Sequence, residues 1–99
     1  MSKLKTKKAK VYKTDGTIET IEFNSKNQLE VFQKAVGGLI QPVTVIVQNK
    51  KPFSMILNEE GLTTLDLPFN PYSHEITEGS IWEYSPFYGN IVVLDSMMR

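Results

Sequence analysis

One histidine and two nearby glutamates are the residues best suited to acid–base or metal chemistry. His74 is the only histidine among 99 residues, with Glu75 beside it and Glu78 four positions further along. An imidazole and two carboxylates could hold a divalent metal ion or act as an acid–base pair. One histidine cannot supply a multi-histidine zinc site or a two-histidine iron site. We therefore expect His74 to be a partly exposed loop residue, with no metal, no cofactor and no catalytic residue in the domain.

Other catalytic centres depend on motifs that this sequence lacks. The chain has no cysteine, which excludes thiol nucleophiles and thiolate metal sites. It also lacks the G-x-S-x-G pattern of serine nucleophiles and both common glycine-rich phosphate-binding patterns. Gly37 and Gly38 follow a predicted helix instead of opening one, so their N–H groups are not placed to bind phosphate. These absences predict a protein that is not an enzyme.

The C-terminal third is rich in aromatic residues and is the candidate contact surface. Tyrosine and tryptophan combine an apolar body with a polar tip, which suits protein interfaces and the stacking of planar bases. The candidate contact residues are Asn70, Tyr72, His74, Trp82, Tyr84 and Tyr88. The alternative is structural: Phe69, Trp82 and Phe87 could simply pack a long loop against the core.

The positive charges are concentrated at the N-terminus. Six lysines lie within the first thirteen residues, so the rest of this electroneutral chain carries 11 acidic and only five basic residues. The candidate phosphate contacts are Lys5, Lys7, Lys8 and Lys10. Such lysines could bind nucleic acid with strong salt dependence. The alternative is a solvated tail leading into an edge strand, where lysines discourage aggregation. The absence of arginine among them favours the alternative, since arginine is preferred for phosphate recognition.

Length and composition predict one globular domain. The chain is 40% hydrophobic and 22% charged, which is typical of a folded protein. We expect a flexible basic tail over residues 1–7, a single domain over 8–95 and a C-terminal tail over 96–99. The N-terminus has no apolar signal region, and apolar runs are far shorter than the roughly 20 residues of a membrane span. A cytoplasmic protein without a membrane partner is expected.

Turn residues between β-rich runs predict two hairpins. The predicted strands cover residues 8–13, 17–23, 43–48, 53–57 and 91–94. Asp15-Gly16 is a frequent hairpin turn and separates the first two runs. Residues 49–52 separate the next two, whose nearly continuous apolar character indicates burial on both faces or a central place in the sheet. The long segment before the last strand is irregular.

A helix is predicted over residues 26–36. Ser25 and Gln28 fit the capping-box pattern, in which two side chains bind free backbone N–H groups at a helix start. The apolar stripe comprises Leu29, Phe32, Ala35 and Val36. Gly37-Gly38 should end the helix, since glycine adopts the left-handed conformation without strain.

These elements predict an α+β fold with the order ββαββ, a loop and a final β-strand. We expect two layers: a mixed sheet of about five strands with one helix packed on it. This arrangement resembles the ubiquitin-like β-grasp, although other α+β topologies give the same element order. The strand order in the sheet is therefore left open.

Short landmarks between residues 36 and 95 resemble those of a known family. They are residues 36–40, 58–61, Leu65, 67–68, Asn70 and 89–94. In this order they are similar to the domain of unknown function 3846, a family of small domains in phages, plasmids and large DNA viruses. The resemblance implies a phage or mobile-element accessory protein without established catalysis, and it assigns no functional residue. The chain departs from the family at Phe69 and residues 71–74, where members tend to have a helix-forming segment, so the resemblance leaves open whether a helix forms there.

We expect a non-enzymatic accessory protein that binds a host protein in the host cytoplasm. The alternative is a domain that binds or sequesters a nucleotide-like signal, with Tyr72 or Trp82 stacking on the base and Asn70 and His74 making polar contacts. A weaker alternative is nucleic-acid binding through the N-terminal lysines. The oligomeric state and the identity of the partner do not follow from the sequence.

Overall fold

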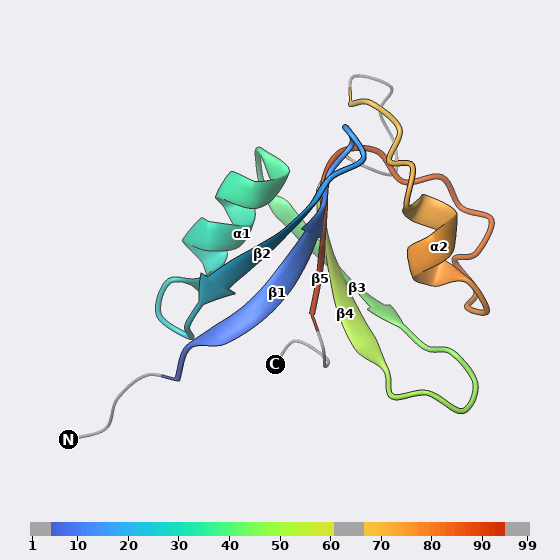
Figure 1. The fold of residues 1–99 in the computed structure, drawn as a ribbon, viewed down its shortest axis with the longest axis horizontal. Coiled ribbons are helices and arrows are strands. Elements are labelled where there is room, and N and C mark those ends of the chain that lie inside the picture. The colour runs from blue at the N-terminus through green and yellow to red at the C-terminus, as the bar shows by residue number, and fades with distance from the viewer. Residues whose placement is uncertain (1–4, 61–66, 95–99) are drawn as a thin grey trace.

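Within the part of the chain that the structure describes, the domain has five strands and two helices (Figure 1). A computed structural model describes residues 5–60 and 67–94. The strands are β1 (Lys7–Tyr12), β2 (Ile18–Phe23), β3 (Ile40–Val45), β4 (Phe53–Asn58) and β5 (Ile91–Val93), and the helices are α1 (Gln28–Val36) and α2 (Ser73–Thr77). Residues 1–4 of the expected tail with Lys3, the landmarks Gly61 and Leu65, and the expected tail over 96–99 lie outside the described residues.

The sheet has the strand order β2-β1-β5-β4-β3, and all four pairings are antiparallel. The expected α+β fold is confirmed, but the expectation of a mixed sheet is wrong. Ile91 pairs with Tyr12 at the end of β1, and Val92 pairs with Ile56 near the end of β4. The chain thus leaves β4 and enters β5 at the same end of the sheet, so β5 runs against both neighbours. The comparison with a β-grasp, which rested on a mixed sheet, no longer applies.

Both faces of the sheet are covered, so the expected two layers become three over the central strands. Helix α1 lies on one side, and the chain around α2 lies on the other (Figure 1). The core under α1 contains Ala9, Val11, Phe23, Phe32, Val36, Ile56, Val92 and Leu94. The core on the opposite face contains Val43, Val45, Met55, Leu57, Phe87 and Ile91. Because side chains alternate along a strand, the apolar run of β4 supplies both cores.

Helix α2 was not expected, and local interactions explain it. The Asn70 side chain accepts a hydrogen bond from the Tyr72 N–H (2.8 Å), and the Ser73 N–H binds the Asn70 carbonyl (3.1 Å). These bonds bend the chain into a turn just before the helix. Pro71 is tolerated there because it precedes the N-cap residue Tyr72, where no helical hydrogen bond needs its missing N–H donor. Neither helix of the described residues is long and apolar enough to cross a membrane.

Helix α1 begins two residues later than expected, and its N-cap residue, Asn27, makes no side-chain cap hydrogen bond. The Asn24 side chain accepts hydrogen bonds from the N–H groups of Lys26 (2.9 Å) and Asn27 (3.0 Å). The Asn27 side chain in turn accepts one from the Asn24 N–H at 2.7 Å. This reciprocal pair resembles a capping box, but it closes the turn that precedes the helix, one residue before the predicted pair. Leu29, expected to be in the buried stripe, is 54% exposed.

The predicted helix stop and both hairpins are confirmed. Gly37 has a φ of 78° and donates its N–H to the Gln33 carbonyl at 2.8 Å. The first hairpin turns through residues 14–16, with Gly16 at a φ of 91°. In the second hairpin, β4 is central and fully covered, as predicted. For β3 the same prediction is wrong, because this strand lies at the edge of the sheet with alternating burial. The edge position accommodates Pro42.

Candidate functional site

The candidate contact residues lie on residues 67–90, here called the α2 segment. Asn70 fastens this segment to the sheet. Its fully buried side-chain amide donates hydrogen bonds to the carbonyls of Tyr12 (2.8 Å) and Gly89 (2.9 Å), and its oxygen accepts from the Tyr72 N–H. Both donor hydrogens are engaged, so Asn70 positions the segment and is not accessible to a partner.

Tyr72 ties the α2 segment to the first hairpin. Its hydroxyl donates a hydrogen bond to the Gly16 carbonyl, and its ring meets the Tyr12 ring edge-on, with centroids 5.1 Å apart. Both ends of the side chain therefore contact the domain itself. This geometry leaves Tyr72 poorly placed to stack on a ligand.

Trp82 and Phe87 pack the α2 segment against the sheet, as the structural alternative predicted. Phe87 is fully buried, and Trp82 is partly buried against the same core, with ring centroids 6.2 Å apart. Phe69 behaves differently: it is 53% exposed and meets the partly buried Tyr88 edge-on at 5.9 Å. Packing thus accounts for two of the three aromatic residues named in that alternative.

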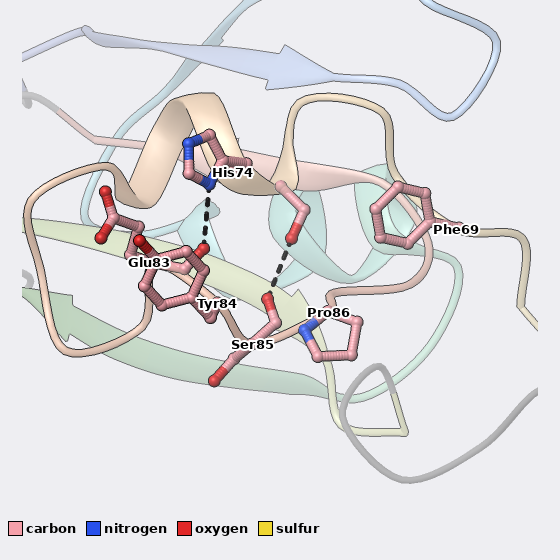
Figure 2. A pocket seen from close by; sticks show the side chains of 7 residues that line it. Phe69, His74, Glu83, Tyr84, Ser85 and Pro86 are labelled. Carbon is pink, nitrogen blue, oxygen red and sulfur yellow. Dashed lines mark hydrogen bonds between the residues drawn. The ribbon is translucent and has the colours of Figure 1, made fainter.

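The exposed side of the α2 segment contains a hollow of about 250 Å³. It is lined by Phe69, Ser73, His74, Glu83, Tyr84, Ser85 and Pro86. Phe69 and Pro86 lie at one end, and His74, Glu83 and Tyr84 lie at the other (Figure 2). Ser73 holds the floor, since its hydroxyl donates to the Ser85 carbonyl (3.2 Å) and accepts from the Phe87 N–H (3.1 Å).

His74 is exposed, and its imidazole is oriented by the chain. Nδ1 lies 3.2 Å from the Glu83 carbonyl, and the ring is tilted by 39° against the Tyr84 ring at 6.1 Å. The carboxylates that approach it are those of Glu78 and Glu83, whose ligand atoms and that of His74 lie within 4.8 Å of one another. The sequence pairing of His74 with Glu75 and Glu78 therefore identified one of the two carboxylates in this group.

A comparison with models of protein families shows to which family the chain is related. The model of DUF3846, a domain of unknown function, matches residues 7–97. The chain belongs to the DUF3846 family. The match extends the resemblance seen over residues 36–95 to include the first hairpin. Neither curated proteins nor solved structures provide a match to this DUF3846 domain.

Three of the four candidate phosphate contacts of the DUF3846 domain are part of the sheet. Lys5 lies before β1, whereas Lys7, Lys8 and Lys10 are exposed residues of β1 itself. Lys8 is opposite Glu22 in the pairing with β2, so a carboxylate interrupts the basic surface. Strand β1 lies between β2 and β5, so the alternative expectation that the lysines lead into an edge strand is wrong.

A second hollow, of about 520 Å³, was not found from the sequence. It lies between the first hairpin and α1, because α1 packs on β3, β4 and β5. Its apolar wall comprises Val11, Ile21, Val31 and Ala35. Lys13 and Glu19 form an ion pair at its rim, 2.5 Å apart, and the hydrogen bond with Glu19 raises the pKa of Lys13. No local sequence motif indicates this hollow, because it depends on where the helix crosses the sheet.

Proposed function

We propose that this DUF3846 domain is a non-enzymatic accessory protein of a phage or other mobile element that binds a host protein in the host cytoplasm. The observation that carries the proposal is the exposure of two large apolar side chains on the α2 segment. Ile81 is 90% exposed and Tyr84 is 88% exposed. Exposed apolar and aromatic groups that gather on one surface are typical of protein contact sites.

The contact side chains project from a well-anchored loop. The Ser80 hydroxyl donates to the Thr77 carbonyl (2.6 Å) and accepts from the Trp82 N–H (3.1 Å). Thr77 also donates its hydroxyl to the Trp82 carbonyl at 3.2 Å. With Trp82 packed against the core, its neighbour Ile81 is left facing solvent. A preorganised loop loses little conformational entropy on binding, which favours affinity.

A mobile-element origin is supported by the resemblance of the chain to small phage, plasmid and viral domains. The absence of cysteine fits a cytoplasmic protein. A host protein is the partner class that such an accessory protein would encounter.

A nucleotide-like ligand has less support from the hollow near His74. None of its lining residues is a lysine or arginine, and Glu83 contributes a carboxylate. Phosphate recognition normally uses cationic side chains or free backbone N–H groups. Its volume of about 250 Å³ is also below the roughly 300–1,000 Å³ of typical small-molecule sites. Nucleic-acid binding likewise has less support, because Glu22 lies opposite Lys8.

The proposal is tested with a surface variant and a matched control. The variant carries Ile81→Ser and Tyr84→Ser. The control carries Leu29→Ser and Leu39→Ser, which remove two other exposed apolar side chains, 54% and 63% exposed. Proteins captured from a bacterial lysate are compared, and the partner is then purified and titrated against all three forms.

We expect the wild type and the control to bind the purified partner equally. The Ile81/Tyr84 variant should bind at least tenfold more weakly, which corresponds to about 1.4 kcal/mol. Equal affinity of all three forms would mean that this surface is not the binding site.

A further inference from the structure

We propose that His74, Glu78 and Glu83 form a binding site for a divalent transition-metal ion of the Zn²⁺ type. Their ligand atoms lie within 4.8 Å of one another. The inference is independent of the proposed protein partner, since it concerns a cation bound by the isolated domain.

The local fold brings the three side chains together. His74 lies in α2 and Glu78 is its C-cap residue, and residues four positions apart lie on the same side of a helical turn. Gly79, with a φ of 83°, then reverses the chain. The Glu83 N–H binds the Ser80 carbonyl at 3.2 Å, which returns Glu83 to the side of His74.

The Glu83 carbonyl selects the tautomer that a metal requires. A carbonyl oxygen can only accept a hydrogen bond, so the Nδ1 atom of His74, 3.2 Å away, carries the proton in this contact. In the neutral ring the lone pair then resides on Nε2, which becomes the ligand atom. A histidine ligand commonly donates its other N–H to a backbone carbonyl in this way.

Glu83 is held in a similar manner. Its Oε1 atom accepts a hydrogen bond from the Gly79 N–H at 3.2 Å, which restricts its side chain while Oε2 remains available. Glu83 is partly buried, whereas His74 and Glu78 are exposed. Ligating carboxylates are usually supported by such outer hydrogen bonds. The cluster therefore has one oriented imidazole, one supported carboxylate and one exposed carboxylate.

The donor set selects the class of ion. One nitrogen and two carboxylate donors suit Zn²⁺ and related ions better than Ca²⁺ or Mg²⁺, which prefer oxygen-only sites. Ligands bound at about 2.1 Å in a tetrahedral site lie roughly 3.4 Å apart. The glutamate side chains would need to move inward by roughly 1 Å, which small side-chain rotations provide. Three protein ligands leave the fourth position to water or to a ligand.

Calorimetric titration of untagged protein with ZnCl₂ tests the site. We expect one ion per chain, and affinity at least tenfold lower in His74→Ala, Glu78→Gln and Glu83→Gln, a change of about 1.4 kcal/mol. Glu75→Gln is the matched control, because this exposed carboxylate lies in the same helix but outside the group. It should bind Zn²⁺ as the wild type does.

NMR gives a second measurement, since His74 is the only histidine and its ring signals are unambiguous. Zn²⁺ should shift the Nε2 resonance strongly and leave the proton on Nδ1. Ca²⁺ and Mg²⁺ should leave both the Nε2 and the Nδ1 resonances unshifted. Circular dichroism should show that the Glu78→Gln variant keeps its fold. The proposal is overturned if Zn²⁺ binds through Nδ1, if the Glu78 and Glu83 variants bind normally, or if excess Zn²⁺ produces neither heat nor a shift.

Discussion

Asn70 shows how one buried polar side chain can organise a long connection. Its amide makes three hydrogen bonds of 2.8 to 2.9 Å, which join Tyr12 at the end of β1, Gly89 before β5 and Tyr72 at the start of α2. Such bonds are costly to leave unmade in the interior. At the residue scale, the position of the exposed side chains on the α2 segment therefore depends on a residue that cannot itself contact a partner.

Asp15 gives a prediction about pH at the residue scale. Its carboxylate accepts hydrogen bonds from the Thr17 hydroxyl (2.6 Å) and N–H (2.9 Å), and these bonds lower its pKa below the ordinary value of 3.8. A lowered folded-state pKa means that the ionised carboxyl stabilises the fold. This stabilisation is complete above the ordinary value and is lost as the pH falls through the lower, folded-state value.

Thr17→Val removes the hydroxyl donor, so the Asp15 pKa should rise toward 3.8. An NMR titration of the Asp15 carboxyl carbon measures this change. Thr20→Val alters an exposed threonine on the adjacent strand and should leave the Asp15 titration unchanged. A wild-type Asp15 that titrates at its ordinary value would contradict the prediction.

At the scale of elements, the turn before α1 gives a prediction that distinguishes the observed Asn24–Asn27 pair from the predicted Ser25–Gln28 cap. Asn24 and Asn27 form the observed reciprocal pair, so Asn24→Ala should destabilise the domain by about 1 kcal/mol. Ser25→Ala, at the predicted cap position, should change the unfolding free energy by less than about 0.5 kcal/mol. Urea denaturation of both variants provides the measurement. A larger loss for Ser25→Ala would favour the predicted cap.

Local signals predicted the hairpins and α1 because turn and helix-stop residues act on their immediate neighbours. The short α2 was missed, since five residues carry little periodic signal and the turn before it depends on the Asn70 side chain. Within the candidate site, the sequence grouped His74 with Glu75 and Glu78, and of these two carboxylates the structure places that of Glu78 in the group with His74. Glu83 was missed because its approach depends on the reversal at Gly79.

For the whole molecule, coverage of the second sheet face is the largest departure from the expected architecture. Phe87 is fully buried there, so Phe87→Ala should cost about 3–5 kcal/mol of unfolding free energy. Phe69→Ala removes a residue that is 53% exposed and should cost less than about 1.5 kcal/mol. Chemical denaturation measures both, with Phe87→Leu as a milder variant if Phe87→Ala does not fold.

Similar losses in the two alanine variants would show that the α2 segment contributes little to this core. Sequence patterning could not place that segment, because a nearly continuous apolar run in a strand requires cover on both faces without specifying which part of the chain supplies it. The same limit applies to the antiparallel direction of β5, which follows from the path of the chain outside the sheet.

The central position of β5 also has a consequence for the order of folding in the cell. The two hairpins precede β5 in the sequence, and among the described strands they are joined into one sheet only by pairing with β5. A nascent chain on the ribosome therefore presents two separate β-ribbons, with the edges of β1 and β4 open, until residues 91–93 emerge. Open edges of this kind attract other chains and chaperones. The edges of β1 and β4 are therefore covered only after the ribosome has synthesised β5.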